Sequence, residues 1–146
     1  MPLMIDHHQT PYIAAEKQAA RKKARSVRQK LAQNNAETAV HLAAHVDDLV
    51  ACYGTGSYAG YLAIHSELSP ALLLQALVDR GVPTALPVTP EAGEPLQFLD
   101  WRPGDRLVDG RFGTKQPVAG AVPVRPHVVL VPLLAFDLTG GRLGYG

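Results

Sequence analysis

Apolar positions along the chain recur at two kinds of spacing, which predict helices and strands. In residues 16–33 and 36–52 they recur every three or four positions, the spacing of one face of an amphipathic helix. Residues 71–80 have a third helical pattern. Ser69 is the expected capping residue, Pro70 the first helical residue, and a glycine ends the pattern.

Short apolar runs bounded by glycine and proline predict the strands. These runs are residues 57–64, 83–88, 96–101, 107–108 and 128–132. The last run is continuously apolar, as expected of a strand covered on both faces. Because helices separate the first strands, the pattern predicts an α/β fold with a mainly parallel sheet. Residues 1–15 are expected to form a flexible leader, and residues 16–146 a single domain.

Composition narrows the class of protein. The chain has 146 residues, of which 47% are hydrophobic and 18% charged, which excludes a disordered protein. No stretch approaches the roughly 20 apolar residues of a membrane helix, and the N-terminus has no secretory signal pattern. The single cysteine, Cys52, excludes an internal disulfide, so we expect a cytoplasmic location.

Charge is concentrated in the first predicted helix. The net charge is +1, and residues 16–30 contain seven basic residues and one acid (+6), so the remainder carries +1 − 6 = −5. On a helix, Lys17, Arg21 and Arg28 fall on a narrow arc beside the apolar stripe, whereas Lys22 points away. This concentration favours one local anion site. From spacing alone, a solvated cationic helix or a helix that contacts RNA is the simpler interpretation.

Two other segments contain candidate functional residues. Glu67 lies between a strand and a helix, where a carboxylate can accept hydrogen bonds from a heterocycle. The alternative is an ordinary loop acid near a helix N-terminus. Residues 139–146, TGGRLGYG, follow the last strand and contain Arg142, an arrangement that can hold phosphate. Here the alternative is a flexible turn. The histidines share no ligand spacing with cysteine or acids, so no metal site is predicted.

Taken in order, six motifs resemble those of one family. They are Lys17, Arg21 and Arg28; GYLAIHSELSPALLLQAL (60–77); GVPTALPV (81–88); WRPGD (101–105); FGTKQP (112–117); and LVPLLAFDLTGGRLGYG (130–146). Over residues 17–146 the chain resembles the 5-formyltetrahydrofolate cyclo-ligase family, also called 5,10-methenyltetrahydrofolate synthetase. Gln116 stands where that family usually has glutamate.

The resemblance implies a three-layer α/β fold with helices on both faces of the sheet. It also implies ATP-dependent, Mg²⁺-assisted cyclisation of 5-formyltetrahydrofolate to 5,10-methenyltetrahydrofolate, with release of ADP and phosphate. By the same resemblance the ATP ligands are Lys17, Arg21, Arg142, Leu143, Gly144, Tyr145 and Gly146. Arg142 is also the catalytic residue, and Leu62 and Glu67 bind the folate. No nucleic-acid or membrane partner is implied, and a monomer is expected.

The family's last motif continues beyond residue 146 with a tyrosine and a metal-binding aspartate. We therefore expect a chain that is C-terminally truncated relative to the family and poorly active alone, with self-association through an exposed sheet edge. A non-catalytic folate- or nucleotide-binding remnant is one alternative. An RNA-binding module that uses residues 16–30 is another. A related α/β enzyme of sugar phosphates or CoA esters is a third, which the Glu67 and RLGYG segments do not support.

Overall fold

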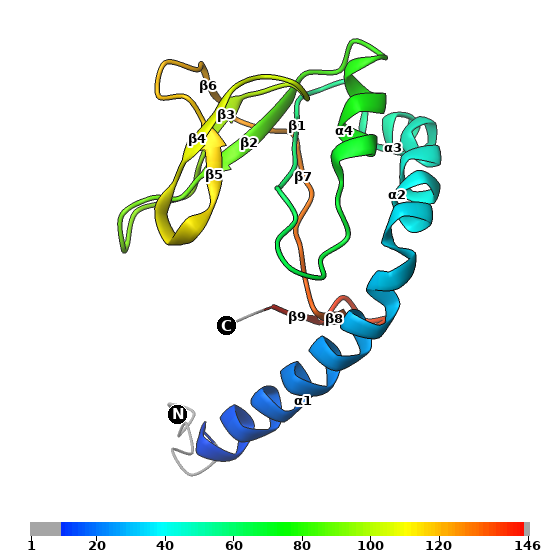
Figure 1. Ribbon diagram of the computed structural model, residues 1–146, viewed down its shortest axis with the longest axis vertical. Helices are drawn as coiled ribbons and strands as arrows, with labels where there is room; N and C mark the ends of the chain where they lie inside the picture. The colour runs from blue at the N-terminus through cyan, green and yellow to red at the C-terminus, as the bar shows by residue number, and fades with distance from the viewer. Residues whose placement is uncertain (1–9, 145–146) are drawn as a thin grey trace, which may run out of the picture. The chain divides into compact units, whose positions relative to one another are not determined.

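The structure, a computed structural model, describes residues 10–144 (Figure 1). The chain divides into two compact units. Unit 1 comprises Met1–Gln33 and Pro132–Gly146, and unit 2 comprises Asn34–Val131. Over the described residues, no helix combines the length and the apolar character that crossing a membrane requires.

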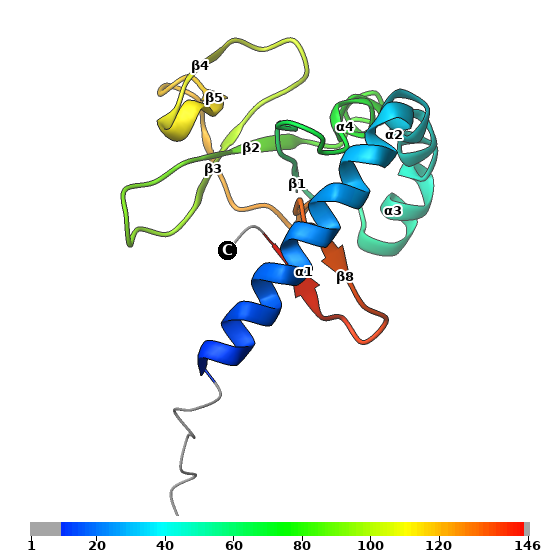
Figure 2. The same cartoon turned by 60° about the horizontal axis from the view of Figure 1, so that its bottom comes forward.

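Unit 1 contains one long helix and one hairpin. Helix α1 (Thr10–Leu31) begins six residues earlier than the predicted residue 16, so part of the expected leader is helical. The hairpin pairs β8 (Ala135–Phe136) with β9 (Arg142–Leu143) and lies beside α1 in both views (Figures 1 and 2). A short 3₁₀ turn, η1 (Ala32–Asn34), follows α1.

Unit 2 has three helices: α2 (Asn35–Ala44), α3 (Val46–Tyr53) and α4 (Ala71–Val78). The single helix predicted over residues 36–52 is wrong, because the chain leaves helical geometry at His45 (φ −84°, ψ 7°). The His45 N–H bonds to the Leu42 carbonyl, three residues back, at 3.2 Å. Helix α4 begins at Ala71 with Pro70 as its N-cap, so the predicted cap at Ser69 and first helical residue at Pro70 are wrong by one position. The Ser69 hydroxyl nevertheless accepts the Ala71 N–H at 3.3 Å.

The main sheet of unit 2 has five strands in the order β6-β3-β2-β1-β7. They are β1 (Tyr58–Ala59), β2 (Thr84–Val88), β3 (Gln97–Asp100), β6 (Pro123–Val124) and β7 (Val128–Val129). Strand β1 is parallel to β2 and β7, whereas β2–β3 and β3–β6 are antiparallel. The prediction of a mainly parallel sheet is therefore wrong: the sheet is mixed. Strands β2 and β3 are joined by a short loop without a helix, which allows only antiparallel pairing.

Two predicted strands are much shorter than expected. The run 57–64 pairs only at Tyr58–Ala59, and the run 128–132 only at Val128–Val129. The second run is also not covered on both faces, since Val129 and Val131 are 44% and 54% exposed. Strand β7 ends the sheet order, so one of its edges has no partner strand in the described chain. The three-layer arrangement stays a prediction.

A second, two-stranded sheet lies within unit 2. It pairs β4 (Leu107–Asp109) with β5 (Lys115–Pro117), and a short turn, η2 (Arg111–Gly113), connects the two strands.

The core of unit 2 joins the sheet to its helices. It consists of Val46, Tyr58, Leu73, Leu74, Leu77, Val82, Leu86 and Trp101. Gly60 is required at the end of β1, because a Cβ there would lie 2.6 Å from Leu74 Cδ1. This close approach fixes where the chain leaves β1, and hence where the loop with Leu62 and Glu67 begins.

Candidate functional site

The loop between β1 and α4 holds Glu67 in one conformation. The residue is buried, with 7% of its surface exposed. Its carboxylate oxygen Oε2 accepts the Ile64 N–H at 2.9 Å, and its own N–H donates to the Ile64 carbonyl at 3.1 Å. Between them His65 has a left-handed backbone (φ 52°), which is uncommon for a residue with a side chain. The carboxylate therefore closes and orients its own loop.

Two further side chains brace this loop, one from α2 and one from the loop itself. The Asn35 amide of α2 donates to the Glu67 carbonyl at 3.1 Å, and the Tyr61 hydroxyl donates to the Leu68 carbonyl at 2.7 Å. Leu62 is half-buried and packs against the core of unit 2. Leu62 and Glu67, the two sequence-predicted folate residues, thus stand on the same braced loop.

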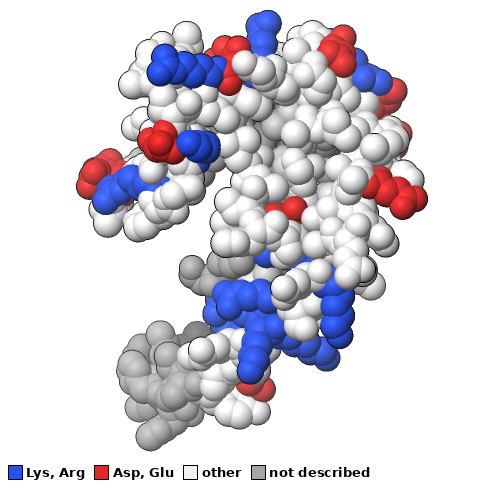
Figure 3. Space-filling model, in the orientation of Figure 1, with Lys and Arg blue, Asp and Glu red and all other residues white. Residues whose placement is uncertain are grey.

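In unit 1, the basic helix and the C-terminal hairpin are hydrogen-bonded to each other. The Arg21 side chain donates through Nε to the Gly144 carbonyl at 3.0 Å, across 123 positions of sequence. Arg142, on β9, and Lys17, on α1, are both exposed. Figure 3 shows the lysines and arginines gathered over α1. Unit 1 therefore brings Arg21 of the basic helix to the terminal segment, and the shared anion site stays a prediction.

An apolar groove of about 570 Å³ lies along α1 and the hairpin. It is lined by Ala20, Lys23, Ala24, Val27, Arg28, Leu31, Leu133, Leu134, Ala135, Phe136 and Leu143. The two charged residues in this set are both cations. A groove of this composition suits a ligand with an apolar part and a negative part.

The glycine-rich turn differs from a phosphate cradle in one respect. The Asp137 carboxylate accepts the N–H groups of Thr139 and Gly141, each at 2.8 Å, so these amides are already hydrogen-bonded. The remaining candidates for the phosphate contacts expected of the segment 139–146 are Arg142 and the residues after it. Of these, Tyr145 and Gly146 lie outside the described residues.

Among residues 10–144, no group of three or more histidine, cysteine, aspartate or glutamate side chains is arranged to hold a metal ion.

Sequence reasoning missed two polar residues that organise these segments, Asn35 and Asp137. Asn35 lies between the two helices predicted over residues 16–33 and 36–52, and nothing local indicates its contact with residue 67. Asp137 had a usable signal, because aspartate two residues before a Thr-Gly-Gly stretch is typical of a turn closed by its own side chain.

The mixed sheet and the hydrogen-bonded basic helix and hairpin define an α/β protein with a concentrated cationic unit. Comparison with known proteins gives its family: the chain belongs to the 5-formyltetrahydrofolate cyclo-ligase family, whose model matches residues 13–146.

Individual relatives agree with this assignment. A 5-formyltetrahydrofolate cyclo-ligase of Mycolicibacterium smegmatis is 36% identical over 94 residues, which cover 59% of this chain and 48% of the relative. A 5-formyltetrahydrofolate cyclo-ligase of Haemophilus influenzae is 31% identical over 121 residues, which cover 80% of this chain and 64% of the relative. The solved structure of Aquifex aeolicus 5,10-methenyltetrahydrofolate synthetase has a TM-score of 0.65 and 28% identity over 89% of this chain and 67% of that one. The chain thus spans about half to two thirds of the length of these curated relatives.

Proposed function

We propose that this protein catalyses the ATP-dependent cyclisation of 5-formyltetrahydrofolate to 5,10-methenyltetrahydrofolate. Family membership supports the reaction class, since the curated relatives carry the cyclo-ligase name. ATP is assigned to unit 1 and the folate to the Glu67 loop of unit 2.

The assignment of ATP depends on one observation, the 3.0 Å hydrogen bond from Arg21 Nε to the Gly144 carbonyl. This bond holds the basic arc of α1 against the strand that contains Arg142. None of the ion pairs recorded among the described residues involves Lys17 or Arg142. A triphosphate carries several negative charges, and cations held on two elements can neutralise them together.

The folate assignment depends on the orientation of Glu67. The Ile64 N–H, bonded to Oε2, holds the carboxylate in one orientation. Carboxylate oxygens are hydrogen-bond acceptors that match the amino and ring N–H donors of a pterin. Half-buried Leu62, on the same loop, supplies an apolar contact for the ring.

The chemistry explains why cations are needed. The N5-formyl oxygen attacks the γ-phosphorus of ATP, the bond to the β–γ bridging oxygen breaks, and ADP leaves. N10 then attacks the activated formyl carbon and loses its proton. Departure of phosphate with the C–O electron pair gives the cyclic amidinium. Phosphoryl transfer is mostly positioning and charge neutralisation, the roles proposed for Lys17, Arg21 and Arg142.

No step of this proposal is assigned to Mg²⁺. The proposed contributions of this chain are to bind and orient the two substrates and to neutralise the phosphates.

The test is a cyclisation assay on residues 1–146 with ATP and 5-formyltetrahydrofolate, following the near-ultraviolet absorbance of the amidinium product. We expect slow ring closure that requires ATP, because the chain is expected to be poorly active alone. Replacing Arg21 by alanine is expected to raise the KM for ATP about tenfold or more. Lys22→Ala, on the opposite face of the same helix, is the matched control. Binding of ATP and the folate without turnover would instead support a non-catalytic binding protein.

A further inference from the structure

The turn between β8 and β9 is closed by its own aspartate. Oδ1 of Asp137 accepts three hydrogen bonds: from the Thr139 N–H at 2.8 Å, the Thr139 hydroxyl at 2.6 Å and the Gly141 N–H at 2.8 Å. Converging main-chain N–H groups of this kind form a seat for an anion. Here the anion is supplied by the chain itself.

The glycines make room for this carboxylate. A Cβ on Gly141 would collide with Asp137 Oδ2, so a side chain at this position would displace the carboxylate. Gly140 has φ +91°, a conformation that other residues rarely adopt. The requirement for two glycines here follows from the turn that encloses the Asp137 side chain. A phosphate-binding role of these two residues is not needed to explain it.

The turn sets the register of the strand that follows it. It places Arg142 opposite Phe136 and Leu143 opposite Ala135. With two residues in each strand, the hairpin has few ladder hydrogen bonds of its own. Its strand register therefore depends strongly on the turn. A slip of one residue would turn Arg142 to the other face and would move the Gly144 carbonyl away from Arg21.

We propose that Asp137 is a positioning residue of the nucleotide site: by filling the turn, it holds β9 in the register that presents Arg142 and Gly144 to the phosphates of ATP. This inference rests on the proposed function for its ligand. It assigns Asp137 no contact with ATP, and it predicts that the charge of Asp137 acts on the turn alone.

The ionisation of Asp137 agrees with this role. Hydrogen bonds from the Thr139 hydroxyl and then from the Gly141 and Thr139 N–H groups lower the pKa of its carboxyl. The side chain is consequently an anion at neutral pH, when the three donors bind it most strongly.

The test compares Asp137→Ala with Asp137→Asn. Asparagine keeps an oxygen at the position of Oδ1, whereas alanine removes it. Asp137→Ala is expected to raise the KM for ATP about tenfold, with the KM for 5-formyltetrahydrofolate unchanged. Asp137→Asn should restore most of the ATP affinity. Asp48→Ala, which removes an exposed carboxylate of α3 in unit 2, is the control and should change neither constant.

A second readout does not need activity. In an amide NMR spectrum at neutral pH, the Thr139 and Gly141 protons should move upfield in Asp137→Ala and much less in Asp137→Asn. Unmoved amide protons would overturn the inference. So would an unchanged KM for ATP in an Asp137→Ala variant that still closes the ring, and in that case the proposed function would stand. If the wild-type protein neither binds ATP nor closes the ring, the proposed function fails and the role of Asp137 in it fails too.

Discussion

At the scale of single residues, Glu67 combines a structural and a proposed binding role in one carboxylate. Glu67→Gln keeps an oxygen for the Ile64 N–H but removes the charge. We predict that the KM for 5-formyltetrahydrofolate rises about tenfold while stability changes by less than about 0.5 kcal/mol. Steady-state kinetics and urea unfolding measure the two effects. An unchanged KM would contradict the assignment of Glu67 to the folate.

Tyr58 shows what one buried hydroxyl contributes to unit 2. Its side chain is fully buried, and its hydroxyl lies 2.9 Å from the Gly54 carbonyl and 3.2 Å from the Leu49 carbonyl. Tyr58→Phe leaves the ring in place and removes the donor. We predict a loss of about 1 kcal/mol in the free energy of unfolding, measured by urea denaturation. A variant as stable as wild type would show that water satisfies both carbonyls.

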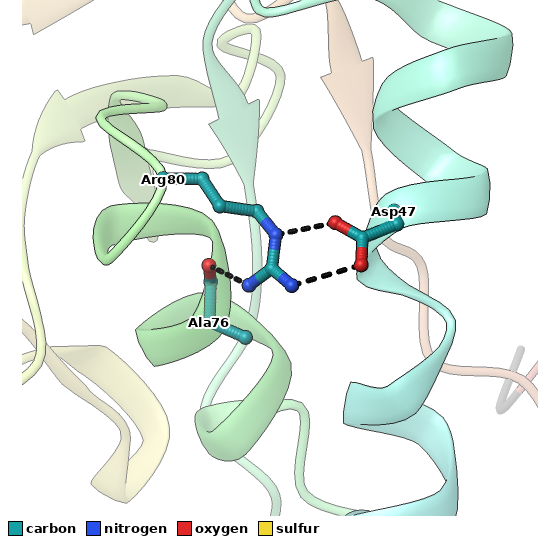
Figure 4. A network of polar contacts seen from close by, with 3 residues as sticks. All are labelled: Asp47, Ala76 and Arg80. Carbon is teal, nitrogen blue, oxygen red and sulfur yellow. Dashed lines mark hydrogen bonds and ion pairs between the residues drawn. The ribbon is translucent and has the colours of Figure 1, made fainter.

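At the scale of elements, the end of α4 is tied to α3 by a two-pronged ion pair (Figure 4). Arg80 donates through Nε and NH2 to the Asp47 carboxylate at 2.6 and 3.0 Å, and through NH1 to the Ala76 carbonyl at 3.0 Å. The hydrogen bond from Arg80 lowers the pKa of the Asp47 carboxyl below its usual 3.8. The pair therefore stabilises unit 2 above pH 3.8, and this contribution disappears as the pH falls through the lowered pKa.

This pair gives a pH-dependent prediction. At pH 7, Asp47→Asn should unfold at a slightly lower urea concentration than wild type, because exposed pairs contribute little. The difference should shrink as the pH is lowered below 3.8, where the wild-type carboxylate becomes protonated. Glu37→Gln, which removes an exposed carboxylate of α2, is the control. A difference that is constant over this pH range would exclude the ion pair as its cause.

At the scale of the whole molecule, the hydrophobic core described above lies entirely in unit 2. Leu77 is fully buried at its centre, whereas Leu72, on the same helix, is 47% exposed. We predict that Leu77→Ala destabilises unit 2 by about 2–5 kcal/mol and that Leu72→Ala costs far less. Fluorescence of Trp101, the single tryptophan and a core residue, reports the transition. Equal effects of the two substitutions would contradict this placement of the core.

Local spacing predicted where several elements lie along the chain. Helix α4 lies within the predicted residues 71–80, and β2 and β3 lie within their predicted runs. The errors concern pairing. An apolar run such as 128–132 satisfies a strand pattern, yet only the residues that find a partner strand form a ladder. The direction of β3 was also not readable from periodicity, because spacing is the same in parallel and antiparallel strands.

The candidate site shows the same division between residues identified from the sequence and contacts that only folding decides. The residues of α1 and of the closing motif were identifiable from sequence, and the family match over residues 13–146 agrees with them. Their roles as ligands of ATP and folate stay predictions. The contacts of Asn35 with residues 66 and 67 were not predictable, since an amide side chain gives no local sign of the distant carbonyl that it will meet.

The sequence by itself determined the helical periodicity, the concentration of cations in one helix and the order of motifs that marks the family. These depend on residue type and on spacing along the chain. Only the tertiary structure decided that Arg21 reaches Gly144, that β3 runs antiparallel and that the glycine-rich turn encloses Asp137. Such contacts depend on which groups folding brings within hydrogen-bonding distance. Each is selected by burial and by the satisfaction of polar groups across the whole chain.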